Sequence, residues 1–195
     1  MKNNEKGRSM VEMLGVLAII GVLSAGGLAG YSKAMFKHKL NTTMDQLTML
    51  VTNIRTMYGT QENYDGLTVG QAYGLGIVAA SASAGTAHSK MINPFKGEVV
   101  LSDEEVKDGV DASGFSVEYQ GLPKEACIAL ATSDWGTGAG SGYIGVQVGP
   151  DADSFAATAE TVTEIGVEGE GIPMSVTDAI GGCGADTNTV KLYFY

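Results

Sequence analysis

The sequence predicts an α+β protein in which one long N-terminal helix packs on a mainly antiparallel β-sheet head that carries one disulfide. Three observations support this fold class. An apolar run near the N-terminus continues into an amphipathic helical pattern, the remaining residues alternate between short strand and short helix patterns, and the chain holds two cysteines. The 195 residues suffice for one domain with its own core beyond the helix.

The first element is a membrane-spanning helix from about Met13 to Tyr31. This stretch contains no charged residue, and at about 1.5 Å per residue it reaches roughly 29 Å, close to the ~30 Å thickness of the hydrocarbon layer. Three basic residues precede it, so the positive-inside rule places the N-terminus in the cytoplasm and everything after Tyr31 across the membrane. A cleavable secretory signal, with residues 24–26 imitating its cleavage site, remains an alternative.

Glu12 places a carboxylate at the very start of this apolar helix. An ionisable group in a membrane segment is costly, which indicates a function and a partner. Near the end of the span, the side chain could instead reach the lipid headgroups. The residue types leave both interpretations open.

The helix is expected to continue from residue 32 to Tyr58 as an amphipathic half. Apolar residues recur there at intervals of three and four, at Leu40, Met44, Leu47, Val51, Ile54 and Tyr58. Gly59 supplies a natural C-terminal cap. The result is one helix from about Arg8 to Tyr58, much longer than the ~11–12 residues typical of globular proteins. A coiled coil would give a similar pattern, but the stripe lasts under three heptads, which favours packing on the head.

The head is predicted to span residues 59–195. Strands are expected at residues 97–101, 115–119, 143–148 and 189–195, because β-branched and aromatic residues gather there. Helices are expected at residues 68–75, 122–131, 154–165 and 175–180, and the small polar stretch 79–89 is expected to be a loop.

Cys127 and Cys183 are the two cysteines of the chain. Because the head lies across the membrane, in an oxidising compartment, we expect them to form a disulfide bounding residues 127–183. Two free buried thiols are the alternative. The bounded segment contains no Lys or Arg and eight acidic residues.

The N-terminus resembles that of type IV pilins and their pseudopilin relatives. The matching features are a short basic leader ending in Gly7, a glutamate, Glu12, at the fifth position counted from Arg8, and an apolar helix of this length. The resemblance implies that a prepilin peptidase removes residues 1–7 and methylates the new N-terminus at Arg8, where the family usually has an apolar residue. It also implies that Glu12 pairs with the freed amine of a neighbouring copy, since a buried carboxylate must be paired or neutralised.

The head adds to this resemblance. The segments INPFKGEVVL and GLPKEACIALA and the closing strand after Cys183 look like the larger type IVb heads of toxin-coregulated and bundle-forming pilins. The resemblance implies a homo-oligomeric helical filament, anchored in the inner membrane of a Gram-negative bacterium before assembly and exposed on the cell surface afterwards. By the same analogy, residues 128–182 are expected to face a host or neighbouring cell.

Composition argues against several other functions. The formal net charge of −10 disfavours nucleic-acid binding, which needs a basic face. No catalytic residues and no cofactor are predicted. His38 and His88 accompany no metal-spaced ligands, and Asp151 with Asp153 gives only a fragment of a calcium loop, so no metal site is predicted either. The remaining alternatives are a pseudopilin or minor pilin of a secretion or DNA-transfer machine, and an uncleaved, membrane-tethered periplasmic binding domain.

Overall fold

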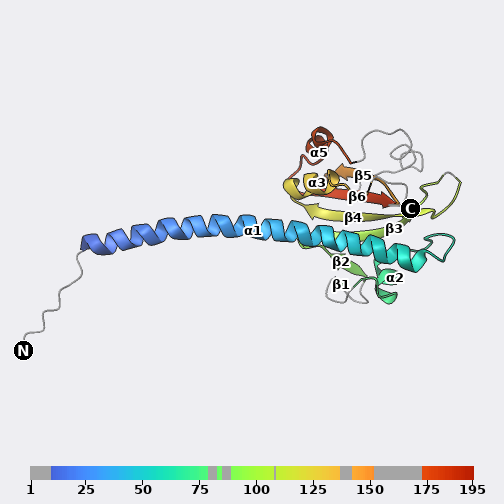
Figure 1. Cartoon of the computed structure of the whole chain (residues 1–195), viewed down its shortest axis with the longest axis horizontal. Helices are drawn as coiled ribbons and strands as arrows, with labels where there is room; N and C mark the ends of the chain where they lie inside the picture. The colour runs from blue at the N-terminus through green and yellow to red at the C-terminus, as the bar shows by residue number, and fades with distance from the viewer. Residues whose placement is uncertain (1–9, 79–82, 85–88, 108, 137–141, 152–172) are drawn as a thin grey trace, which may run out of the picture. The chain divides into compact units, whose positions relative to one another are not determined.

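A computed structural model describes residues 10–78, 83–84, 89–107, 109–136, 142–151 and 173–195. The chain divides into two compact units, Met1–Asn41 and Thr42–Tyr195. The first unit contains the N-terminal part of helix α1 (Met10–Tyr58), and the second contains the rest of that helix together with the head (Figure 1).

Helix α1 runs without interruption for 49 residues. Its sequence contains no proline, so nothing removes a backbone donor or forces a kink. The helix ends at Tyr58, immediately before Gly59, as the sequence predicts. Its expected first residue, Arg8, lies outside the described residues. All side chains from Met10 to Ala34 are exposed.

Within the second unit, α1 buries one face against the head. The buried residues, spaced by three and four, are Thr43, Leu47, Leu50, Ile54 and Tyr58. The predicted packing face is therefore confirmed at Leu47, Ile54 and Tyr58. Val51 is only partly covered, whereas Leu50 is buried. Positions 50 and 51 flank the same helix face, so the spacing alone does not decide which of them is covered.

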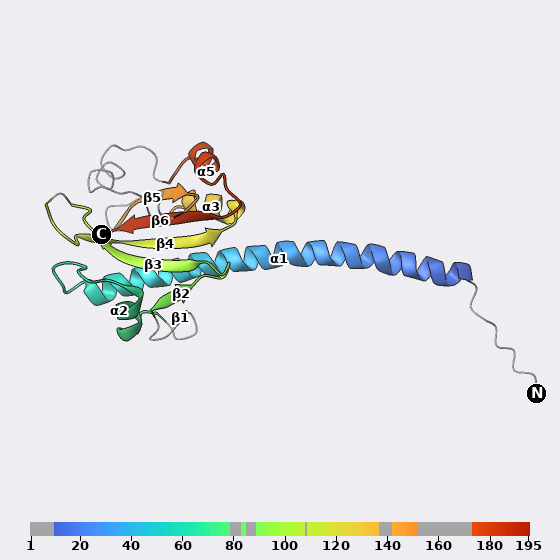
Figure 2. The same ribbon diagram turned by 180° about the vertical axis from the view of Figure 1, so that it is seen from behind.

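The head is built on a six-stranded sheet with the strand order β1-β2-β3-β4-β6-β5 (Figure 2). All neighbouring strands are antiparallel, which confirms the predicted sheet type. The strands are β1 (Ser83–Ala84), β2 (Lys90–Ile92), β3 (Glu98–Glu104), β4 (Gly114–Leu122), β5 (Tyr143–Gly149) and β6 (Asn188–Phe194).

Alternation along β4 separates the two faces of the sheet. Phe115 lies on a face of the sheet where aromatic rings gather. Its ring centroid is 4.9 Å from that of Tyr64 and 5.4 Å from that of Phe194. Tyr64 in turn stacks on Tyr58 of α1 at 5.4 Å. Because successive side chains of a strand point to opposite faces, Ser116 belongs to the other face. One face therefore packs on α1, and the other carries polar groups.

Asn93 fixes the turn between β2 and β3. Its Oδ1 accepts hydrogen bonds from the backbone N–H groups of Phe95 and Gly97, at 2.9 and 3.0 Å, and its Nδ2 donates to the carbonyl of Gln120 at 2.8 Å. Gly97 lies so close to that carbonyl that a Cβ at position 97 would overlap it. The turn is thus tied to β4 by one buried amide and one close backbone approach.

Three short helices complete the described head: α2 (Val69–Gly74), α3 (Lys124–Ala131) and α5 (Val176–Gly182). Thr68 and Ser175 are the N-caps of α2 and α5, and each side chain accepts a backbone N–H of the first turn. Pro123 precedes α3 in an extended conformation. These helices agree with the sequence prediction, while the helix predicted at residues 154–165 lies outside the described residues.

The expectation of a loop across residues 79–89 is wrong in part. Ser83 and Ala84 form strand β1, which pairs with Met91 and Lys90 of β2. Residues this small carry little strand propensity. A neighbouring strand supplies the backbone partners, and a local pattern cannot report that pairing.

Candidate functional site

The predicted processing and assembly residues lie at the start of the chain. Glu12 is exposed in the first turn of α1, where a carboxylate is favoured by the positive end of the helix dipole. Gly7 and Arg8 lie outside the described residues. The structure therefore describes the carboxylate and its helix but not the proposed cleavage site.

The N-terminal part of α1 presents a continuous apolar surface. By length and composition, α1 is the one helix among the described residues that could cross a membrane. Large apolar side chains are strongly exposed along it, with Val11, Val22 and Leu23 each 70% exposed or more. An apolar surface of this extent marks a site of association with lipid or protein.

The structure joins Cys127 and Cys183 in a disulfide that links α3 to the C-terminal end of α5. The two Cα atoms are 5.9 Å apart, and both residues are fully buried. The bond closes a segment with a sequence separation of 56. Acidic side chains of this segment that the structure describes, Asp134, Asp151 and Asp178, are exposed.

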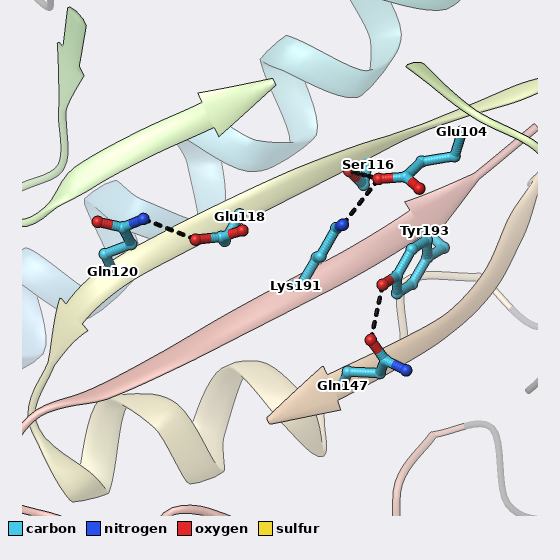
Figure 3. A network of polar contacts seen from close by, with 7 residues as sticks. All are labelled: Glu104, Ser116, Glu118, Gln120, Gln147, Lys191 and Tyr193. Carbon is cyan, nitrogen blue, oxygen red and sulfur yellow. Dashed lines mark hydrogen bonds and ion pairs between the residues drawn. The ribbon is translucent and has the colours of Figure 1, made fainter. Parts of the chain in front are cut away.

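A polar cluster lies on the sheet face opposite α1 (Figure 3). Lys191 of β6 forms an ion pair with Glu104 of β3, with Nζ and Oε1 2.8 Å apart and side chains only 13% and 15% exposed. The hydroxyl of Ser116 donates to the same carboxylate at 2.6 Å. The Lys191 ammonium also lies 5.1 Å from the centre of the Tyr193 ring. The Glu104 carboxylate of β3 thus connects Ser116 of β4 with Lys191 of β6.

Tyr193 extends this cluster to the edge strand. Its hydroxyl donates to Oε1 of Gln147 on β5 at 2.6 Å, and the residue is fully buried. Burial raises the pKa of the Tyr193 phenol, and the nearby carboxylates of Glu104 and Glu118 raise it further, so the phenol stays neutral near pH 7. The register of β3, β4, β5 and β6 brings the side chains of this cluster together. The sequence prediction did not include the cluster, although the charged Lys191 inside an apolar strand was a usable signal.

The described residues contain no group of three or more His, Cys, Asp or Glu side chains that could hold a metal ion. His38 is exposed on α1, and Asp151 is exposed after β5. His88 and Asp153 lie outside the described residues.

Comparisons with known proteins match most of this chain. The Bundlin family model covers residues 33–192. The sequence is 29% identical over 147 residues to the "major structural subunit of bundle-forming pilus" of Escherichia coli O127:H6, covering 75% of this chain and 73% of that protein. The same description and figures apply to the protein of Escherichia coli O111:H-.

Solved structures agree on the fold. The crystal structure of TcpA, a type IV pilin from Vibrio cholerae El Tor, superposes with a TM-score of 0.56 at 17% identity, covering 81% of this chain and 99% of that one. Both have the type IV pilin fold, a long helix packed on an antiparallel sheet. The Bundlin family model spans well over half of the 195 residues of this protein, so the chain belongs to the Bundlin family.

Proposed function

We propose that this protein is a structural subunit of a type IV pilus, polymerised through its N-terminal helix. The observation that carries the proposal is the family match over residues 33–192, together with a relative described as the major structural subunit of bundle-forming pilus. The head has the fold of type IV pilins and can be exposed on the surface of a filament. The exposed apolar part of α1 can pack against the same helix of other subunits. The proposal assigns no catalytic residue, cofactor or metal.

Before assembly, the subunit is held in the inner membrane by residues 13–31. Prepilin peptidase cuts between Gly7 and Arg8 and methylates the new α-amino group. Support comes from the order of these residues, because the family match begins only at residue 33. The positive-inside rule then orients the head toward the periplasm of a Gram-negative cell.

Glu12 drives assembly by pairing with the α-amino group of Arg8 on a neighbouring subunit. A carboxylate among packed apolar helices is strongly destabilising when it is unpaired, and an amine at the same depth removes that cost. Only one axial offset brings the two groups together. The pair therefore selects the register of helices whose apolar contacts alone would permit sliding.

In the filament, the heads cover the outside, and the disulfide-bounded residues 128–182 face other cells. The exposed carboxylates of Asp134, Asp151 and Asp178 support this placement, since a solvated acidic surface suits the outside of a fibre. Adhesion and aggregation are the functions that such a filament would serve.

Mass spectrometry of the mature N-terminus tests processing. The expected species starts at Arg8 and carries one added methyl group. An intact Met1 would instead identify an uncleaved, membrane-tethered domain and would overturn the proposal.

Shearing of cells tests assembly. Parental subunits are expected in sheared surface filaments, whereas Glu12→Ala subunits should be processed yet remain in the membrane. Glu125→Ala, which removes an exposed acid of α3, is the matched control and should leave the yield unchanged. Equal yields from Glu12→Ala and the parent would refute the pairing. Subunits confined to cell envelopes and absent from the sheared fraction would identify a pseudopilin.

A further inference from the structure

The charges of this protein are divided between its two units. Before Thr42 the sequence has six Lys or Arg and two Glu, a net charge of +4, which leaves −14 for residues 42–195 out of the total of −10. Removal of residues 1–7 leaves four Lys or Arg and one Glu before Thr42, a net charge of +3. Acidic heads packed side by side repel one another unless opposite charges lie between them. A filament of this subunit therefore needs a source of positive charge close to the heads.

The basic residues that follow the apolar helix supply that charge. Lys33 and Lys37 are four positions apart, so they share one face of α1, and both are exposed. Neither takes part in an ion pair within the described part of the chain. Membrane orientation does not require them, because positive charge on the far side of a span opposes the positive-inside rule.

The C-terminal end of α1 carries the complementary surface on the head. Asp103 lies opposite Phe115 in the pairing of β3 with β4, and the Phe115 ring is 4.9 Å from that of Tyr64. Tyr64 stacks on Tyr58 at the end of the helix and is followed directly by Asp65, so both acids lie around this end. The backbone N–H of Tyr64 donates to the carbonyl of Ala112 at 2.9 Å and brings the neighbouring loop to the same place. The acidic end so defined consists of Glu62, Asp65, Asp103 and Asp111.

Basic residues only partly offset this charge. Arg55 lies in the last turn of α1, and Lys107 lies in the adjoining loop. The four carboxylates of the acidic end outnumber these two cations, so the acidic end keeps a negative charge. Glu62, Asp65 and Asp111 are exposed, so a second copy can reach them.

We propose that the Lys33–Lys37 face of one subunit lies against the acidic end of the head of a second subunit in the filament. The inference rests on the proposed pilus function and adds a second electrostatic contact, outside the membrane, to the apolar helix packing. A single exposed ion pair contributes little by itself. A filament repeats the contact at every subunit, and the opposite charges also remove the repulsion between heads.

A charge-swap experiment tests the contact. The variant Lys33→Glu/Lys37→Glu should lower the yield of sheared filaments roughly tenfold, since two attractive pairs become repulsive. Asp65→Lys/Asp111→Lys should have a similar effect. Combining the two sets of changes in one chain should restore most of the yield. Lys96→Glu/Lys124→Glu, an equal double reversal at exposed lysines of the head, is the control and should assemble like the parent.

Rescue by the combined variant distinguishes a contact between subunits from other roles of the lysines. Parental yield from Lys33→Glu/Lys37→Glu, or no recovery in the combined variant, would overturn the inference and leave the pilus function intact. Loss of the lysine variant from the membrane fraction, without recovery in the combined variant, would assign the lysines to lipid headgroups and would also overturn it. The proposed function itself fails only if the parental chain forms no filaments.

Salt dependence gives a second test that involves no charge reversal. Electrostatic attraction is screened over about 10 Å at 0.1 M salt and about 3 Å at 1 M. Parental filaments should therefore dissociate in detergent more readily at high salt. Filaments of Lys33→Gln/Lys37→Gln should lose most of that salt dependence. An identical salt response from both filaments would contradict the proposal.

Discussion

Replacing tyrosine by phenylalanine should change the free energy of unfolding in opposite directions at two buried positions, Tyr119 and Tyr193. Tyr119 is fully buried, and its hydroxyl has no hydrogen-bond partner among the described residues. A buried polar group left unpaired costs about 1–3 kcal/mol, so Tyr119→Phe should raise the free energy of unfolding by an amount of that order. Tyr193→Phe removes the 2.6 Å bond to Gln147 and should lower it by about 1–2 kcal/mol.

The burial of Tyr119 also predicts how the stability of the protein changes at alkaline pH. Burial raises the pKa of Tyr119 above the ordinary phenol value of about 10. Above pH ~10, the unfolded phenol loses its proton while the native one keeps it, so the unfolded state binds fewer protons and stability falls as pH rises. Each such tyrosine contributes a loss of about 1.4 kcal/mol per pH unit. Tyr119→Phe should remove one such contribution, whereas the chain should show no tyrosine-dependent change below pH ~9.

The assay is urea unfolding of the full chain in detergent micelles, followed by the fluorescence of Trp135, the single tryptophan. This residue reports on the head, where its indole N–H donates to the carbonyl of Leu130 at 3.0 Å. The measurement is made at pH 7, 10 and 11. A Tyr119→Phe variant less stable than the parent at pH 7 would show that its hydroxyl is paired. An unchanged alkaline slope would refute the assignment of the pKa shift.

Three further substitutions test the packing of the head. Replacing Cys127 and Cys183 by Ser should cost about 4 kcal/mol, because the disulfide closes a separation of 56 residues; reduction of the parental chain should reproduce that loss in urea. Gly97→Ala should cost about 2–4 kcal/mol because its Cβ would overlap the carbonyl of the neighbouring strand, whereas Gly74→Ala, in open space, should be tolerated in the same assay. Lys191→Met should cost about 2 kcal/mol by leaving its carboxylate partner without a cation, and the double variant that also neutralises that carboxylate should recover part of the loss.

Much of the fold follows from local patterns. The helix end at Tyr58, strands β3 to β6 and helices α2, α3 and α5 all carry periodicity or capping residues that a single segment displays. Strands β1 and β2 do not. Their pairing depends on a partner some eight positions away and on the Asn93 turn, which ties them to β4.

The candidate site divides in the same way. The apolar helix with Glu12, and the two cysteines, are visible as residue types at informative positions. The ion pair between Lys191 and Glu104 is not, because 87 positions separate the residues in the sequence and only the register of β3, β4 and β6 brings them together.

The sequence by itself determined the length of the helix, its apolar half and the sign of the charge on each unit, since these depend only on residue type and spacing along one chain. Tertiary structure alone decided which side of the helix is covered, where a phenol is buried without a partner, and which carboxylates gather at the end of α1. Those features arise from contacts between segments that are distant in the chain. Such contacts are set by strand register and packing, which no single segment encodes.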